Sequence, residues 1–573
     1  MKSFCVNLLA IIIICCLGII VYSNTFLCSF HLDDVFSIVD NLSIKNIFNL
    51  QNIWNFWPCR FITYLSIALN YHFHQLGVFG YHLFNLGVHV GSTILVWWLI
   101  RLTFSTPKMK DQKIAQHSDL ISFFTGVIFI THPIQTQGVT YIIQRAASLA
   151  ALFYLASLGC YVKSRLLQQG VGNQVVSRYF YSFSLIAAVI AMFTKEITIT
   201  LPLMICLYEF SFFRIKRGFN WKHLVPFLFT LFIIPFTMLL TRSVNFVEMR
   251  RTIDSTPGIS PWHYLLTQFR VMITYIRLVF LPLNQNLDYD YPIAKTLLSL
   301  PILVSLFCLV SILILAIKLF RNYRLIAFSI FWFFLTLLPE SSTIPIMDVI
   351  FEHRLYLPMV GYSLFLVSGL YYLFKEKRIK FTVSVLCLFL IFYSILAYQR
   401  NKIWKDEFTL WSDTIRKSPH KARAYFNRGK ACRQKGNFHQ AILDYNKAID
   451  IDPNYADAYN NRGNVYLDKG DLNQAIFDYT KAIKLNSNFA VAYCNRGSAY
   501  DVKDSFDQVI SDYTKSIELD PGYALAYYNR AVTYYFKQEY IKAWDDLRKA
   551  ELLGFNINFD FQDKLKKAVG EEK

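Results

Sequence analysis

The sequence predicts an all-α protein in which a multi-pass helical membrane domain is followed by an α-solenoid of short repeats. Two observations predict the membrane domain: 54% of the 573 residues are hydrophobic and 17% are charged, and long apolar runs recur through residues 1–400. This composition is typical of multi-pass membrane proteins. A motif that recurs at a fixed spacing after residue 420 predicts the stacked helical repeats.

Eleven apolar runs are long enough to cross, or nearly cross, a hydrocarbon layer of about 30 Å. The run 264–281 contains Arg270 and Arg277, so we expect it to form an interfacial helix at the membrane surface. The first run follows Lys2 without a convincing cleavage site, which favours an uncleaved span over a signal peptide. The expected spans are about 4–22, 80–104, 120–132, 146–162, 179–194, 197–213, 223–241, 301–319, 325–339, 355–374 and 381–399.

Basic residues fix the expected orientation. With the N-terminus in the cytoplasm, the short cytoplasmic loops hold the Lys and Arg clusters, as the positive-inside rule requires. Counting 264–281 as a crossing would move the last two clusters outside, so we keep it at the surface and place the C-terminal tail outside the cytoplasm. The clusters lie at 108–113, 163–165, 214–217, 318–324 and 375–380.

Acidic residues of the membrane part are distributed in the opposite way. Eleven of the fifteen in residues 1–401 fall outside the cytoplasm in this topology, although the positive-inside rule does not require it. A site on the outer face that needs carboxylates would explain the bias. The eleven are Asp33, Asp34, Asp40, Glu196, Glu248, Asp254, Asp288, Asp290, Glu340, Asp348 and Glu352.

The net charge of +19 does not indicate a nucleic-acid partner. Residues 402–573 hold 27 Lys and Arg against 24 Asp and Glu, so the basic excess belongs to the membrane part, where orientation explains it. The 11 cysteines lie mostly in apolar runs and show no metal-ligand spacing. We therefore expect neither a disulfide framework nor a zinc site.

The tail contains a repeat of 34 residues, which is the period of the helix-turn-helix tetratricopeptide repeat (TPR). Each repeat has an aromatic residue in its first helix, such as Tyr425, and a small residue where its two helices cross, such as Gly429. The repeated triplets are Asn427-Arg428-Gly429, Asn461-Arg462-Gly463, Asn495-Arg496-Gly497 and Asn529-Arg530-Ala531.

The repeats set the expected domain boundaries. Trp411 and Pro419 stand one period before Tyr445 and Pro453, which indicates a half-repeat before the first full one. The polar segment after Gly554 is typical of a capping helix that solubilises the last repeat. We expect a membrane domain at 1–400, a half-repeat junction at 401–421, four repeats at 422–557 and a capping helix at 558–573.

Candidate catalytic residues gather in the first long polar loop, 23–61. His31-Leu32-Asp33-Asp34 places two carboxylates directly after the first span, and Arg60 closes the loop. Carboxylates beside a bilayer are costly unless they face water or a cation, so they are candidates for function. A solvated acidic turn is the alternative for such a pair taken alone.

Three later hairpins on the same expected face combine cations with polar partners. Membrane-edge groups of this mixture suit a lipid-phosphate substrate, although a lone Lys-Glu pair would be a structural ion pair. The residues concerned are His132 with Arg145, Lys195 with Glu196, and Glu352-His353-Arg354.

These residues would support transfer of a sugar from a lipid-phosphate carrier to a hydroxyl group. Asp33 or Asp34 would act as general base, and fixed cations would stabilise the leaving phosphate. We assign the phosphate to Arg60, Arg145, Lys195, His353 and Arg354, with His31, His132, Glu196 and Glu352 in support. No metal-ligand set is predicted and no cofactor is certain beyond the donor, although the phosphate chemistry would accommodate a divalent metal ion.

The order of these motifs resembles the GT-C membrane glycosyltransferases, and within them the transmembrane and tetratricopeptide repeat (TMTC) O-mannosyltransferase family. The likeness covers nearly the whole chain, which departs from the family at Cys59 and in having only about four repeats. The matching stretches are His31-Leu-Asp-Asp34, Trp57-Pro-Cys-Arg60-Phe-Ile-Thr63, Asn70-Tyr71, His82 to His89, His132-Pro133 with Arg145-Ala-Ala147, Lys195-Glu196 and Glu352-His-Arg-Leu-Tyr-Leu-Pro358.

The resemblance implies a GT-C-like membrane domain, a dolichyl- or polyprenyl-phosphate mannose donor, and transfer to Ser or Thr of proteins. The repeats would then bind the acceptor. Asn427, Asn461, Asn495 and Asn529 recur at a position that can face the concave groove and clamp a peptide backbone, or can bond neighbouring helices instead. Asn41-Leu42-Ser43 matches a glycosylation sequon.

Alternative functions remain at this stage. A lipid-linked-sugar ligase or polymerase would use the same donor with a glycan acceptor, and a non-catalytic membrane scaffold would need only the repeats. A transporter is least favoured, because the spans show no internal repeat. The expected location is a bacterial inner membrane or the endoplasmic reticulum, with the N-terminus cytoplasmic and the repeats extracytoplasmic.

Overall fold

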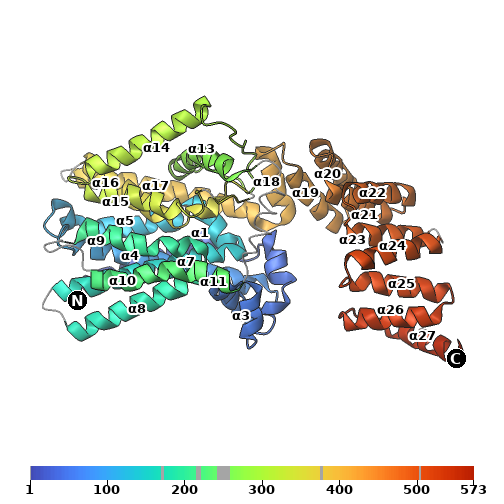
Figure 1. Cartoon of the computed structure of the whole chain (residues 1–573). Helices are drawn as coiled ribbons and strands as arrows, with labels where there is room; N and C mark the ends of the chain where they lie inside the picture. Colours follow the sequence, from blue (N-terminus) through green and yellow to red (C-terminus); the bar gives the residue numbers. More distant parts are fainter. Residues whose placement is uncertain are drawn as a thin grey trace. The chain divides into compact units, whose positions relative to one another are not determined.

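The computed structural model of the chain describes residues 2–169, 173–213, 221–241, 259–342, 344–346, 348–374, 378–502 and 505–572. The regular elements within these ranges are all helical (Figure 1), which confirms the all-α prediction. The chain divides into two compact units, Met1–Leu410 and Trp411–Lys573. Glu248, Asp254 and the basic residues at 214–217 and 375–377 lie outside the described residues.

The first unit is a bundle of long helices that run roughly parallel to one another (Figure 1). Short 3-10 turns connect several of them and carry five of the candidate site residues, Arg60, Glu196, Glu352, His353 and Arg354. The helices are α1 Lys2–Tyr22, α2 Leu50–Phe56, α3 Phe61–His74, α4 Val78–Phe104, α5 Ser118–Thr131, α6 Thr136–Thr140, α7 Arg145–Gln169, α8 Gln174–Met192, α9 Leu201–Phe212, α10 Trp221–Phe229, α11 Ile233–Leu240, α13 Pro261–Phe280, α14 Leu300–Leu319, α15 Arg324–Leu337, α16 Pro358–Phe374 and α17 Ile379–Asn401.

Seven helical segments among the described residues are long and apolar enough to cross a membrane, which supports an integral membrane protein. Three apolar helices are shorter: Val6–Tyr22, Arg324–Leu337 and Pro358–Phe374. The 14 residues of α15 reach only about 21 Å at 1.5 Å per residue, less than a hydrocarbon core of about 30 Å. The seven are Val78–Phe104, Lys113–Thr131, Ile142–Gln169, Gln174–Met192, Trp221–Leu240, Leu300–Leu319 and Ile379–Lys405.

Small residues let the bundle helices approach closely, as is typical of membrane proteins. Between α7 and α8, the Ser157 hydroxyl donates to the Ser184 carbonyl at 2.8 Å and the Ser184 hydroxyl returns a bond to the Ser157 carbonyl at 2.6 Å. Between α15 and α16, a Cβ on Gly361 would lie 2.6 Å from the Ser329 carbonyl oxygen. These contacts hold the helices whose ends carry the polar loops.

The second unit consists of helix pairs stacked in sequence (Figure 1). Each pair occupies one period of the repeat, and a single helix follows the last pair. The helices are α18 Glu407–Lys417, which begins in the first unit, α19 Ala422–Gln434, α20 Phe438–Ile451, α21 Ala456–Asp468, α22 Leu472–Leu485, α23 Ala490–Asp501, α24 Phe506–Leu519, α25 Ala524–Phe536, α26 Tyr540–Leu552 and α27 Phe559–Glu572.

A glycine and a tyrosine define the helix crossing in the first three repeats. A Cβ on Gly429 would lie 2.9 Å from the Tyr445 ring, and Gly463 and Gly497 meet Tyr479 and Tyr513 in the same way. In the fourth repeat the glycine is replaced by Ala531, and the facing aromatic is replaced by Leu547. The two changes compensate, because the narrower leucine leaves room for the alanine methyl group; both residues are fully or nearly fully buried.

An arginine-aspartate pair also recurs in each repeat. Arg462 donates two hydrogen bonds to the buried Asp478 carboxylate, at 2.8 and 2.7 Å, and lies over the Tyr459 ring at 5.4 Å. Such two-pronged pairs fix geometry as well as contributing energy. The equivalent pairs are Arg428 with Asp444, Arg496 with Asp512, and Arg530 with Asp546.

Candidate functional site

The two adjacent aspartates of the first loop lie in different environments. Asp34 is fully buried, and its carboxylate accepts the backbone N–H of His31 at 3.0 Å and of Ile143 at 2.7 Å. Burial raises the pKa of Asp34 to about 8, although these two N–H bonds oppose the shift. Asp33 is exposed. Asp34 therefore joins two loops, whereas the exposed Asp33 carboxylate, which interacts with the Tyr141 hydroxyl, is accessible to a substrate.

Arg60 and Glu196 form a two-pronged ion pair between two loops. The Arg60 Nε lies 3.0 Å from Glu196 Oε1 and its Nη2 lies 2.9 Å from Oε2, while the guanidinium stacks on Trp57 at 4.5 Å. Burial alone would raise the pKa of Glu196, but the Arg60 charge and hydrogen bonds lower it overall. Both side chains remain more than a quarter exposed, so Arg60 is held in place but accessible.

Lys195 has a different partner from its neighbour Glu196. Its ammonium lies 3.3 Å from the Glu340 carboxylate, and the lysine side chain is only 5% exposed. Burial lowers the pKa of Lys195, and Glu340 opposes that shift. Lys195 also lies close enough to Arg60 for the two charges to interact. The two cations thus share one region, and each has its own carboxylate.

His353 lies in the same electrostatic neighbourhood. Burial lowers its pKa, and the charges of Lys195, Arg354 and Arg60 lower it further, so its ring is neutral. The ring stacks on Phe351 with centroids 5.0 Å apart. Its Nδ1 is buried and has no hydrogen-bond partner among the described residues. A buried polar atom without a partner is costly, so a ligand at this position would satisfy it.

Tyr64 connects the cation region to Asp33. Burial raises the pKa of its hydroxyl, the charge of Asp33 raises that pKa further, and the charge of Arg60 opposes the shift. Its ring stacks against Trp57, and its hydroxyl lies 3.4 Å from the Ser37 hydroxyl. The exposed aspartate and the partly exposed arginine therefore both lie close enough to this tyrosine for their charges to act on it.

Glu352 and Arg354 form hydrogen bonds with other groups of the protein. The fully buried Glu352 carboxylate accepts from the Asn286 backbone N–H and the Tyr289 hydroxyl, both at 2.6 Å. Arg354 donates to the carbonyl oxygens of Asp348 at 2.9 Å and Val349 at 3.1 Å. These contacts fold the loop that presents His353, and the predicted phosphate contact of Arg354 stays a prediction.

Arg145, His31 and His132 are buried within the packing. Arg145 donates to Asn85 Oδ1 at 2.8 Å and to the Ser66 carbonyl at 3.1 Å, so it fastens α7 to α3 and α4. The His132 ring contacts the Val279 carbonyl at 3.0 Å, and the His31 ring contacts the Trp404 carbonyl at 2.7 Å. The predicted phosphate contact of Arg145 stays a prediction that these bonds do not favour.

An apolar groove of about 970 Å³ extends to Ser341 and Ser342. It is lined by side chains of α9, α13, α14 and α15, such as Leu207, Phe269 and Leu313, and it includes Ser341 and Ser342. Ser341 follows Glu340 directly. The groove therefore reaches the residue next to the carboxylate that holds Lys195.

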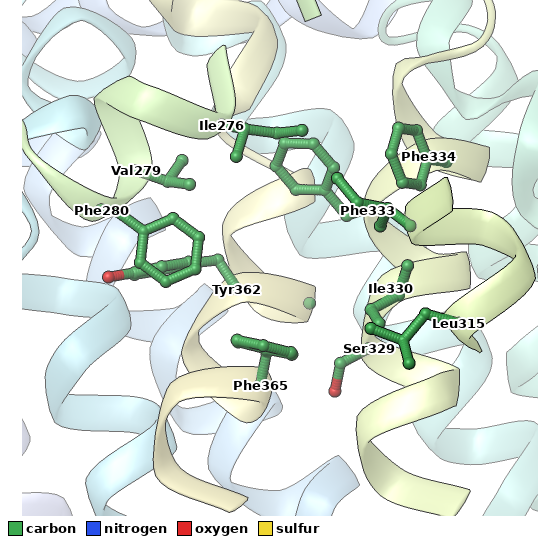
Figure 2. A pocket seen from close by; sticks show the side chains of 12 residues that line it. Ile276, Val279, Phe280, Leu315, Ser329, Ile330, Phe333, Phe334, Tyr362 and Phe365 are labelled. Atoms are coloured by element: carbon green, nitrogen blue, oxygen red, sulfur yellow. The ribbon is translucent and has the colours of Figure 1, made fainter. Parts of the chain in front are cut away.

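A second apolar cavity of about 240 Å³ lies between α13, α14, α15 and α16. Figure 2 shows Phe280, Phe333 and Tyr362 among the side chains around it. Phe334 lines both this cavity and the larger groove. The cavity and the groove are therefore adjacent, with the Phe334 side chain between them.

The asparagines of the repeats already make hydrogen bonds. Asn427 and Asn461 donate to carbonyl groups of their own helices, and Asn495 donates to Asn460 Oδ1 of the preceding repeat at 2.9 Å. Asn529 contacts the Cys494 sulfur of the preceding repeat at 3.9 Å. Peptide binding by this ladder stays a prediction, since the amides serve at least partly to join helices.

Asn41 of the sequon is 4% exposed. Its Nδ2 donates to the Ser37 carbonyl at 3.0 Å, and its Oδ1 accepts from Ser43. The structure therefore argues against a glycan at this asparagine. Within the described ranges, no group of three or more His, Cys, Asp or Glu is arranged to hold a metal ion.

Two contributors to the site were not singled out from the sequence. Glu340 belonged to the acidic bias of the expected outer loops, and that bias is the signal that could have found it. Tyr141, whose hydroxyl accepts the Asp33 backbone N–H at 3.0 Å, lies in an apolar stretch without a local motif. Its role follows only from long-range packing.

Models of the tetratricopeptide repeat match four stretches of the tail, at residues 429–470, 456–489, 490–523 and 512–545, which confirms the predicted repeats. The solved structures that share likeness with the tail include the crystal structure of MamA, at 26% identity over 26% of this chain and 85% of that chain, with a TM-score of 0.24.

About three quarters of the chain is distantly homologous to TMTC protein O-mannosyl-transferases. Protein O-mannosyl-transferase Tmtc3 of Drosophila melanogaster is 25% identical over 78% of this chain and 55% of that protein. Protein O-mannosyl-transferase TMTC3 of Homo sapiens is 23% identical over 75% of this chain and 50% of that protein. The chain thus spans about half the length of these curated relatives.

Proposed function

We propose that the chain is a membrane glycosyltransferase that moves mannose from a dolichyl- or polyprenyl-phosphate carrier to Ser or Thr hydroxyls of extracytoplasmic proteins. The observation that carries the proposal is the convergence of Arg60, Lys195 and His353 beside an apolar groove, with the exposed Asp33 facing the same region. The distant relatives are named as protein O-mannosyl-transferases.

The donor phosphate would bind between Arg60, Lys195 and the free ring nitrogen of His353. Glu196 and Glu340 hold the two cations in position before the donor arrives, and such preorganised charges stabilise a developing anion most effectively. A phosphate oxygen would also give the buried Nδ1 of His353 its missing partner. Arg354 would add a fixed positive charge behind the histidine.

The lipid tail of the donor would lie in the groove formed by α9, α13, α14 and α15. The lining of that groove is almost entirely apolar, and its volume is about 970 Å³, which suits an isoprenoid chain. The position of Ser341 and Ser342 at the groove, directly after Glu340, would bring the phosphate at the end of the tail to Lys195. A carrier of this kind can enter sideways from the bilayer.

The reaction would be a single displacement. The acceptor oxygen attacks C1 of the sugar while Asp33 takes the hydroxyl proton as general base. The bond between C1 and the phosphate oxygen breaks, and the lipid phosphate leaves with the electron pair, stabilised by Arg60 and Lys195. Attack from the face opposite the phosphate would invert the configuration at C1.

The same proposal includes the orientation of the chain. The site loops and the repeats would lie on the extracytoplasmic face of a bacterial inner membrane or the endoplasmic reticulum, with the N-terminus in the cytoplasm and eleven crossings in all. The repeats would bind acceptor proteins through the asparagine ladder. A reporter fused after Lys573 should be active only outside the cytoplasm, and cytoplasmic activity would contradict the proposal.

The decisive experiment incubates the purified protein with labelled lipid-phosphate mannose and Ser- and Thr-containing peptides. The wild type should transfer the label, and Asp33→Asn should lose transfer. Asp40→Asn is the matched control, since Asp40 is exposed in the same loop and has no proposed role; it should transfer normally. Full transfer by Asp33→Asn would refute the assigned mechanism.

The alternatives give different results in this assay. A ligase or polymerase would transfer the sugar to glycans but leave no hexose on Ser or Thr, which mass spectrometry of the peptides detects. A scaffold would transfer nothing. We favour the protein acceptor because the relatives are named for it.

A further inference from the structure

The backbone of the His31–Asp33 segment is held by side chains from distant parts of the chain. The N–H of His31 donates to Asp34 Oδ2 at 3.0 Å, that of Leu32 to Glu407 Oε1 at 3.3 Å, and that of Asp33 to the Tyr141 hydroxyl at 3.0 Å. Leu32 has a φ of +47°, a conformation that a leucine rarely adopts. Three successive N–H groups thus define the direction in which the Asp33 side chain leaves the backbone.

The acceptor of the Asp33 N–H is itself positioned by Trp404. The rings of Tyr141 and Trp404 stack with centroids 5.5 Å apart and an interplanar angle of 26°. The backbone carbonyl of Trp404 contacts the His31 ring at 2.7 Å, and its indole meets that ring edge-on at 5.8 Å. Trp404 therefore contacts both His31, two residues before Asp33, and the tyrosine that accepts the Asp33 N–H.

Trp404 lies in the 3-10 turn Lys402–Lys405, between α17 and α18. This turn is anchored on the bundle, because Asn401 donates to the Val21 carbonyl at 3.0 Å and accepts from Thr140 at 3.0 Å. The Trp404 side chain is fully buried. Its indole nitrogen has no hydrogen-bond partner within the described ranges, so the ring acts through packing alone.

We propose that Trp404 is a positioning residue that sets the direction of the Asp33 carboxylate through Tyr141. The inference rests on the proposed function, in which Asp33 is the general base. A base must lie within hydrogen-bond reach of the proton it removes, and a small displacement can lower a rate by up to about 100-fold. The Tyr141 stack prevents such a displacement, and Trp404 maintains the stack.

The test compares variants that keep or remove the flat ring. Trp404→Leu should lower kcat by about 10-fold or more, because the Tyr141 ring loses its stacking partner. Trp404→Phe keeps an aromatic ring and loses no hydrogen bond, so it should stay within about threefold of the wild type. Tyr141→Phe removes the hydroxyl that accepts the Asp33 N–H and should resemble Trp404→Leu. In all three the KM for donor and peptide should be unchanged, since the phosphate-binding residues are untouched.

Trp411→Phe is the matched control, because Trp411 is equally buried but belongs to the repeat unit; it should keep the kcat of the wild type. The inference is wrong if Trp404→Leu and Tyr141→Phe are folded and retain the wild-type kcat. It is also wrong if Trp404→Phe loses as much activity as Trp404→Leu. In both cases the proposed function still stands, provided that Asp33→Asn is inactive. If Asp33→Asn is fully active, the proposed function fails and the inference fails with it. Tyr141→Phe keeps the ring volume, so it gives an answer even if Trp404→Leu does not fold.

Discussion

The two adjacent aspartates should respond in opposite ways to the same substitution. Replacing Asp34 by Asn should destabilise the protein, because Asp34 is fully buried and both carboxylate oxygens accept backbone N–H groups. Replacing Asp33 by Asn should leave stability unchanged and abolish transfer, because Asp33 is exposed. These two outcomes would separate a structural carboxylate from a catalytic one within a single dipeptide.

The size of the Asp34→Asn effect follows from its two contacts. An asparagine can accept one of the two N–H groups, but its amide hydrogens would face the other. The lost hydrogen bond is worth about 1 kcal/mol, and the buried N–H left without an acceptor costs about 1–3 kcal/mol. At about pH 5, where the buried carboxyl is protonated and its hydroxyl oxygen can still accept an N–H, the free energy of unfolding should fall by about 2–4 kcal/mol. For Asp33→Asn the change should stay within about 0.5 kcal/mol, as for other surface substitutions.

Two measurements on the detergent-solubilised protein test this assignment. Unfolding in denaturant reports stability, and transfer from labelled lipid-phosphate mannose reports activity. Asp33→Asn should reduce the transfer rate by about 100- to 10,000-fold, as expected for loss of a general base. If Asp34→Asn proves as stable as the wild type but inactive, and Asp33→Asn transfers normally, the two roles would have to be exchanged.

Three further predictions concern other charged groups. Glu196→Gln should raise the KM for the donor by about fivefold, because Arg60 loses the partner that orients it. The same variant should change the free energy of unfolding by about 1 kcal/mol or less, since both side chains are more than a quarter exposed. An unchanged KM would argue against a phosphate at Arg60. Asp478→Asn should lower the free energy of unfolding by about 3 kcal/mol, because it leaves Arg462 of a buried pair without its partner. Asp468→Asn, in a pair with Arg433 that is about one-third exposed, should lower it by less than about 1 kcal/mol. Equal effects of the two variants would show that burial does not set the cost. Burial raises the pKa of Asp34 to about 8, above about 4 in an unfolded chain. Its contribution to stability is therefore complete below about pH 4 and is lost as the pH rises through about 8. Between about pH 5 and pH 9 the wild type should lose more stability than Asp34→Asn, and parallel curves of stability against pH would contradict this.

The repeat unit was predictable from the sequence because its contacts are local. Each glycine meets a tyrosine of the same repeat, and each arginine pairs with an aspartate 16 residues further on. A period read along the chain therefore reports directly on contacts in space. The fourth repeat keeps the same pair of positions, with Ala531 in place of the glycine and Leu547 in place of the tyrosine.

The ion pairs of the candidate site were less predictable. The sequence brings Lys195 and Glu196 together, yet they do not pair with each other: Lys195 contacts Glu340, and Glu196 contacts Arg60. Lys195 has an extended backbone, with φ −159° and ψ 147°, and consecutive side chains in extended backbone point in opposite directions. The sequence identified the charged residues, but their partners come from other loops.

The direction of the loop that carries Asp33 depends on even more distant contacts. Leu32 is held at a φ of +47°, at a cost of about 1–3 kcal/mol for such strained backbone, and this turn places Asp33 in the open while Asp34 enters the packing. The partners that sustain it are Glu407 and the Trp404 carbonyl, which lie 375 and 373 residues further along the chain than Leu32 and His31, respectively. No local rule would give a leucine this conformation, because local preferences oppose it. Contacts from the C-terminal end of the membrane unit therefore determine which of the two neighbouring aspartates is exposed. A substitution at Trp404 should change the position of the Asp33 side chain.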